Sequence, residues 1–167
     1  MTPSGVTVSS ISSPVTGQVE VTCAACPSLP GRNRVSQAHR YESGGQVLYA
    51  WCARDTLFLP ARLGQAARVT SACPVTGEPI ELTVTPAGVT ETSHPEAVVS
   101  FLRPDGPFDA GVIESFCHFV HFFARRQAGE QWTAGHPGTF LLTLGEAADL
   151  ASQGNRRMFP DVLRHAG

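Results

Sequence analysis

The chain has 167 residues, 42% of them apolar, which is enough to bury the core of one ordinary globular domain. Its net charge of −2 offers no basic surface of the kind that nucleic acid requires, so we expect no nucleic-acid partner. All of the basic residues are arginine, and the absence of lysine excludes Schiff-base chemistry.

The start of the chain and its cysteines indicate the cellular compartment of the protein. Residues 1–13 are small and uncharged, and they lack the positive start and apolar core of a secretory signal. No apolar run approaches the roughly 20 residues of a membrane span. The five cysteines do not form the paired pattern of a small disulfide scaffold. We therefore expect a cytoplasmic protein without a membrane partner, whose thiols stay reduced.

Residues 1–36 are rich in Ser, Thr, Pro and Gly, with one expected strand at residues 18–22. They contain Cys23 and Cys26, a spacing that suits a soft metal or a redox pair. A closed zinc site needs two further ligands, and the chain has no matching second pair. The two thiols are either a metal-handling or redox pair or bystanders in a surface loop.

Residues 37–167 are expected to form one catalytic domain. Strands and helices come in runs without regular βαβ alternation, which favours an α+β fold with antiparallel strands in small mixed sheets and short helices. The expected strands are residues 46–51, 67–71, 80–85, 97–102, 118–123 and 139–144. The expected helices are residues 53–63, 110–116, 129–134 and 145–163.

Two local features refine this prediction. The turn at residues 74–79 should join the strands on either side of it into an antiparallel hairpin. Pro60 lies inside an expected helix that stops at Gly64, and it should bend or shorten that helix because proline cannot donate to the preceding turn.

The most informative stretch is an apolar strand that leads into a helix carrying Cys52 and Asp55. Residues three apart on a helix are surface neighbours, so a thiol and a carboxylate would be presented together. The helix start favours an anion and tends to lower the pKa of a thiol. Cys117, in an aromatic segment, could complete a site for a soft metal ion with one proton donor.

Each of these residues also has an ordinary structural interpretation. Cys52 and Cys117 could be buried core thiols, since free cysteine is among the most buried residue types. Asp55 could be a solvated carboxylate at a helix start. The nearby aromatic residues should build the core, and around a two-thiol site they would also exclude water and receive an apolar organic group. These residues are Tyr49, Trp51, Phe116, Phe119, Phe122 and Phe123.

Several short motifs occur in order between about residue 37 and about residue 150. They are His39-Arg40-Tyr41, residues 48–55, Ser71-Ala72-Cys73-Pro74 with Thr76-Gly77, Ser115-Phe116-Cys117, and His121-Phe122-Phe123-Ala124. In order and spacing they resemble the organomercurial (alkylmercury) lyase family. That family carries a longer amino-terminal region, similar to a winged-helix domain, before the first motif. The chain therefore resembles a short form that lacks this domain.

The resemblance implies an enzyme that breaks the carbon–mercury bond of an organomercurial by protonolysis, giving a hydrocarbon and Hg²⁺. It implies that Cys52 and Cys117 are catalytic thiolates that bind mercury, and that Asp55 protonates the departing carbon. Mercury is substrate and product, so no cofactor is expected. The family's usual partner is mercuric reductase, and low-molecular-weight thiols are a second acceptor for Hg²⁺. By their spacing alone, Cys23 and Cys26 could serve as an intermediate landing pair.

Other residues in the motifs are expected to be structural. Cys73 matches a family cysteine regarded as structural, and His118 stands where some members have another, dispensable cysteine. His121 should face the core or support the second catalytic cysteine through a hydrogen bond. His39 and Arg40 are expected to be structural or lid-forming, with Arg40 able to pair with a carboxylate.

Two other functions stay open. A soft-metal (Hg/Cu-type) binding or transfer protein would keep both thiols without cleaving a bond, although simple binding does not need an acid at Asp55. A related lyase could act on another carbon–heteroatom bond.

Overall fold

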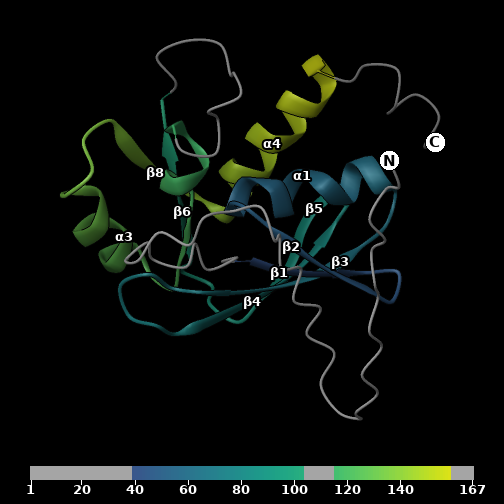
Figure 1. Ribbon diagram of the computed structural model, residues 1–167, viewed down its shortest axis with the longest axis horizontal. Coiled ribbons are helices and arrows are strands. Elements are labelled where there is room, and N and C mark those ends of the chain that lie inside the picture. The colour runs from purple at the N-terminus through teal and green to yellow at the C-terminus, as the bar shows by residue number, and fades with distance from the viewer. Residues whose placement is uncertain (1–38, 104–114, 159–167) are drawn as a thin grey trace, which may run out of the picture. The chain divides into compact units, whose positions relative to one another are not determined.

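A computed structural model of the chain describes residues 39–103 and 115–158, all of which belong to the unit Arg34–Gly167. Within these ranges, two antiparallel sheets pack with α-helices in an α+β arrangement, as expected (Figure 1). The expected strand at residues 18–22, most of the expected helix at residues 110–116 and the end of the last helix lie outside the described residues. None of the described helices is long and apolar enough to cross a membrane.

The larger sheet has five strands in the order β2-β1-β3-β4-β5. Their bounds are His39–Ser43 for β1, Gln46–Ala50 for β2, Ala67–Ala72 for β3, Pro79–Thr85 for β4 and Gly88–Thr92 for β5. The predicted β3–β4 hairpin is confirmed. Strands β1 and β5 were not predicted. The sequence signal for β1 was the pair Gly44-Gly45, and in the structure both glycines have positive φ and close a tight β1–β2 turn.

One face of this sheet forms part of the core. Side chains of β3 and β4 alternate between buried and exposed, and Val69, Ile80 and Leu82 are fully or almost fully buried. Strand β2 lies at the sheet edge, and Tyr49 and Trp51 are 55% and 49% exposed. The expectation that these two aromatic residues build the core is therefore wrong, since every residue of β2 before Ala50 is exposed and Trp51 follows the strand.

The smaller sheet has the order β7-β6-β8, with β6 at Val98–Leu102, β7 at Phe122–Phe123 and β8 at Thr139–Thr143. Helix α3 (Arg126–Thr133) packs on β6 and β8, and it begins earlier than predicted. The strand predicted at residues 118–123 is wrong in its first half. There the chain forms a 3-10 turn, η1 (Cys117–Phe119), because the N–H groups of Phe119 and Val120 bond to carbonyls three residues back rather than to a strand partner.

Helix α1 (Ala53–Leu63) has the predicted bounds and ends at Gly64, whose φ of 65° only glycine adopts readily. Pro60 lies inside the helix without shortening it. Helix α4 (Leu144–Met158) packs against α1 (Figure 1). The Asn155 side-chain amide of α4 donates to the Phe58 carbonyl of α1 over 3.0 Å. This contact helps to hold α1 in place.

Candidate active site

Cys52, Asp55 and Cys117 converge in the structure. The two sulfur atoms and a carboxylate oxygen all lie within 4.8 Å of one another. Cys52 is 1% exposed and Cys117 is 8% exposed, while Asp55 is half-buried. Among the described residues this is the only group of three or more Cys, His, Asp or Glu side chains that could hold a metal ion. The sequence singled out the same three residues.

The start of α1 positions Cys52 and Asp55 locally. Cys52 precedes the helix in an extended conformation, with φ −144° and ψ 163°. Its backbone N–H donates to Asp55 Oδ2 over 3.3 Å, the geometry of a capping box in which the third helical residue reaches back. The spacing Cys-x-x-Asp therefore brings the carboxylate back over the cysteine.

A backbone hydrogen bond connects this helix start to the turn that carries Cys117. The Ala53 N–H donates to the Val120 carbonyl over 3.1 Å, and the Val120 N–H in turn donates to the Cys117 carbonyl over 3.2 Å. Ala53 follows Cys52 directly, so this bond holds the two cysteines in one place. The pairing involves no side chain, and the sequence contained no sign of it.

Ser100, on β6, is a positioning residue that the sequence reasoning missed. Its buried hydroxyl donates to the Phe119 carbonyl over 2.7 Å and accepts from the His121 N–H over 3.0 Å. These two bonds fix the segment that follows Cys117. A single polar residue in the apolar strand Val98–Leu102 was the available signal, because a buried hydroxyl needs a partner.

Replacing Ser100 with alanine should leave two backbone groups near Cys117 without their partner. We expect the free energy of unfolding to fall by about 1–3 kcal/mol, and turnover at the site to fall by roughly ten- to a hundredfold because the sulfur atoms lose their alignment. Ser71→Ala is the matched control, since it removes another buried serine hydroxyl, which bonds to His39 Nδ1 over 2.9 Å. Denaturation should show that both variants are less stable than wild type. Kinetics should show that only Ser100→Ala loses turnover. Equal turnover in the two variants would contradict the positioning role.

The two thiols differ in acidity. The hydrogen bond with Cys52 lowers the pKa of Cys117, and the positive charge of Arg54 adds to this effect. The same hydrogen bond, burial and the Asp55 carboxylate raise the pKa of Cys52. The expectation that the helix start lowers the Cys52 pKa is therefore wrong, since these three effects outweigh the helix dipole. Of the two thiols, Cys117 is therefore the one that ionises more readily.

The Asp55 carboxyl is poised to take up a proton. Burial raises its pKa above the ordinary aspartate value, although hydrogen bonds from Cys52 and the charge of Arg54 oppose the shift. A carboxyl group with a raised pKa accepts and donates a proton more readily near neutral pH than an ordinary exposed one.

Cys73 lies apart from this cluster. It is buried at the end of β3, where its backbone N–H donates to the Glu78 carbonyl over 2.9 Å and its carbonyl accepts from the Gly77 N–H over 2.8 Å. Its place is the β3–β4 turn, in keeping with a structural thiol. Cys23 and Cys26 lie outside the described residues.

The histidines of the motifs have structural contacts. The ring Nε2 of His121 pairs with the His118 carbonyl at 2.7 Å, so its hydrogen bond goes to η1 and not to the Cys117 sulfur. His39 is buried in β1, and burial lowers its pKa to about 3, which keeps it neutral. It belongs to the sheet and forms no lid. Arg40 pairs with Glu42 at 2.7 Å, as its chemistry suggested.

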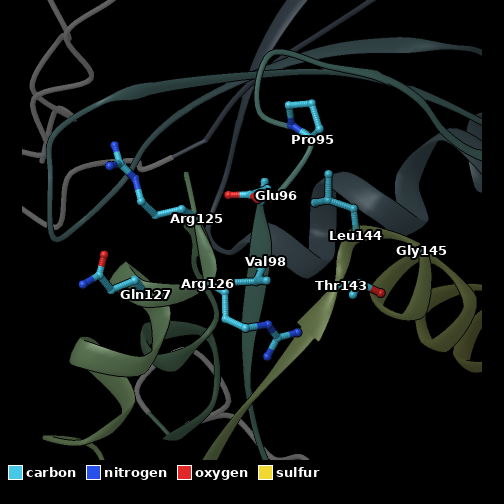
Figure 2. Close-up of a pocket in the computed structure, with 10 residues that line it drawn as sticks. Pro95, Glu96, Val98, Arg125, Arg126, Gln127, Thr143, Leu144 and Gly145 are labelled. Carbon is cyan, nitrogen blue, oxygen red and sulfur yellow. The ribbon is translucent and has the colours of Figure 1, made fainter.

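Two cavities have the size of a small-molecule pocket. The larger, of about 530 Å³, lies between the start of β6, the start of α3 and the β8–α4 junction (Figure 2). Its lining includes Glu96, Arg126 and Leu144 and none of the three site residues. The smaller, of about 300 Å³, is lined by Arg54 and Phe116, the chain neighbours of Asp55 and Cys117. The smaller cavity is therefore lined by sequence neighbours of the site, although none of the three site residues lines it.

Comparison with known proteins identifies the family. The family model described as alkylmercury lyase (MerB) matches residues 34–154, a range that includes all three site residues. The chain belongs to the alkylmercury lyase family. An alkylmercury lyase of Streptomyces lividans is 47% identical over 112 residues, which cover 67% of this chain and 51% of the relative. One of Pseudomonas putida is 42% identical over 127 residues, which cover 76% and 59%.

The similarity to these lyases extends to the fold. A crystal structure of the mercury-bound form of MerB2 matches with a TM-score of 0.58 at 30% sequence identity, over 71% of this chain and 58% of that chain. The chain spans about half the length of the curated alkylmercury lyases that it matches.

Proposed function

We propose that the chain cleaves the carbon–mercury bond of organomercurials by protonolysis, with no cofactor. The observation that carries this proposal is the approach of two sulfur atoms and one carboxylate oxygen to within 4.8 Å of one another. Thiolates are soft ligands and suit mercury far better than carboxylate or water does. A carboxylate beside two thiols adds the acid that bond cleavage needs and that simple metal binding does not.

The reaction begins at Cys117. Its thiolate attacks the mercury of R–Hg–X, forms a sulfur–mercury bond and releases X⁻. Cys52 then gives its proton to the Asp55 carboxylate and forms the second sulfur–mercury bond. The raised pKa of Cys52 keeps this proton in place until mercury arrives, and the proximity of Asp55 provides its acceptor.

The second step breaks the carbon–mercury bond. Two thiolates load electron density onto mercury, which weakens its bond to carbon, and Asp55 passes its proton to that carbon. The hydrocarbon R–H leaves and Hg²⁺ stays between Cys52 and Cys117. The proton that began on Cys52 ends on the hydrocarbon, and the negative charge of Cys117 is balanced by departure of X⁻.

Release of the metal requires another thiol. Cys117 is the more exposed of the two cysteines, so an incoming thiolate would attack mercury from that side. We propose hand-off to mercuric reductase or to a low-molecular-weight thiol, because free Hg²⁺ would react with other proteins. Cys23 and Cys26 stay a candidate landing pair, and unchanged release in a Cys23→Ser, Cys26→Ser double variant would count against it.

The test is arene release. The purified chain, incubated with phenylmercury acetate and excess low-molecular-weight thiol, is expected to form benzene catalytically, measured by gas chromatography. A Cys73→Ser variant should keep this activity while it folds, since its thiol lies outside the cluster. Stoichiometric mercury binding without benzene would overturn the proposal in favour of a soft-metal binding or transfer protein.

A further inference from the structure

The cavity of about 530 Å³ has no part in the proposed reaction, since none of the three site residues lines it. Figure 2 shows that its lining comes from three segments, namely the start of β6 with the residues before it, the start of α3, and the β8–α4 junction. Its floor is closed, because Ala97, Val98 and Leu144 are at most 8% exposed. A ligand in this cavity would therefore be recognised by the polar groups around the rim.

Close packing holds α3 against the smaller sheet beside this cavity. Gly129 is buried on α3, and a Cβ atom at this position would lie within 3.0 Å of side-chain atoms of Val98 and Leu141. Glycine at this position lets the helix approach β6 and β8 closely. The start of α3 is therefore a packed wall of the cavity.

Two of the charged side chains around the cavity already have partners. Arg125 pairs with Glu78 at 2.6 Å. Glu146, at the start of α4, accepts hydrogen bonds from the Thr143 N–H and hydroxyl, each over 2.8 Å. Glu96 and Arg126 line the cavity as well, and within the part of the chain that the structure describes neither side chain forms an ion pair. The cavity thus has one carboxylate and one guanidinium available to a ligand.

The start of α3 adds hydrogen-bond donors beside Arg126. Arg125 is the N-cap residue, and its side chain makes no capping hydrogen bond. The first N–H groups of a helix have no acceptor inside the helix, and with the helix dipole they favour an anion. Hydrogen bonds from the backbone and hydroxyl of Thr143 lower the pKa of Glu146, and the charge of Arg126 adds a smaller effect. The guanidinium therefore acts across the cavity, between α3 and the start of α4.

We propose that this cavity binds a zwitterion, namely an amino acid or short peptide that has a free ammonium group and a free carboxylate. The carboxylate pairs with Arg126, whose planar donors match it, and accepts hydrogen bonds from the first N–H groups of α3. The ammonium group pairs with Glu96. A simple anion would instead be repelled by the Glu96 carboxylate. This site is independent of the lyase proposal, because it uses none of the three site residues.

The test uses the dipeptide alanylalanine and two analogues that each lack one charge. N-acetyl-alanylalanine has no ammonium group, and alanylalanine amide has no carboxylate. NMR titration of the full chain should show saturable binding of the dipeptide, with shifts of the amide signals of Arg126 and Gln127. Each analogue should bind about three- to fivefold more weakly, the size of one exposed ion pair. If the N-acetyl analogue bound as tightly as the dipeptide, the cavity would be a simple anion site and the proposal would fail.

Two variants assign the charges. Glu96→Gln should make alanylalanine and its N-acetyl analogue bind equally, and Arg126→Gln should do the same for alanylalanine and its amide. Glu130→Gln and Arg156→Gln are the matched controls, since they remove the same charges from exposed residues outside the cavity and should bind the dipeptide like wild type. All four positions are exposed, so the variants should keep the wild-type thermal stability. Absence of saturable dipeptide binding to wild type, or equal losses in the variants and their controls, would overturn the zwitterion site.

Discussion

Cys117→Ser is expected to lower arene release from phenylmercury by at least about a thousandfold, the scale seen when a residue of a concerted catalytic group is removed. In the proposed mechanism Cys117, whose pKa is lowered by its hydrogen bond with Cys52, makes the first bond to mercury. A serine hydroxyl ionises far less readily and is a hard ligand that binds mercury poorly. The remaining thiol, Cys52, stays buried beside the Asp55 carboxylate, and both effects still raise its pKa and slow its attack.

The control for this variant is the third buried thiol of the described region. Cys73→Ser should lower the free energy of unfolding by roughly 1–3 kcal/mol, because it buries a hydroxyl in place of a thiol, and leave turnover of the folded protein intact. Mercury stoichiometry and arene release on the two variants measure binding and chemistry separately. A fully active Cys117→Ser variant would remove Cys117 from the mechanism.

Asp55→Asn is expected to retain mercury binding and to lose turnover by about a hundred- to ten-thousandfold, the usual contribution of a positioned proton donor. The amide oxygen of asparagine can still accept the hydrogen bond from the Cys52 N–H, so the start of α1 should keep its geometry. An amide cannot take the Cys52 proton or pass it to carbon. Mass spectrometry of the variant should therefore show an intact R–Hg adduct on the protein.

A second half-buried carboxylate provides the comparison for Asp55→Asn. Glu42 lies on β1 and pairs with Arg40, outside the cluster, so Glu42→Gln should leave arene release unchanged. If Asp55→Asn released arene at the wild-type rate, the proton would have to come from elsewhere, and the role of Asp55 would be limited to capping α1.

Local patterns in the sequence predicted much of the fold. The bounds of α1 follow from an apolar strand before it and Gly64 after it, and the β3–β4 hairpin follows from two alternating runs around a proline-containing turn. Strand β1 was missed because its charged sequence lacks the alternation of a half-buried strand, and the glycine pair after it was the one local signal of the β1–β2 hairpin.

The aromatic residues show that residue type alone does not predict which side chains are buried. Phe122 and Phe123 are fully buried, whereas Tyr49 and Trp51 are about half exposed. All four are large and apolar, so hydrophobicity does not distinguish them. Both pairs lie on or next to an edge strand, β7 and β2, so their burial depends on which other elements cover that strand, and β7 contacts both α3 and β3.

The sequence by itself determined the chemistry that is available: a thiol and a carboxylate three residues apart at a helix start, a second cysteine in an aromatic segment, and motifs of one family. These features are local, since spacing along one helix already decides how Cys52 and Asp55 meet. Only the tertiary structure decided that Cys117 joins them and that it is the more acidic thiol. Both outcomes depend on contacts between distant segments, namely the Ala53–Val120 backbone bond, the Ser100 hydroxyl and the hydrogen bond with Cys117 that raises the Cys52 pKa.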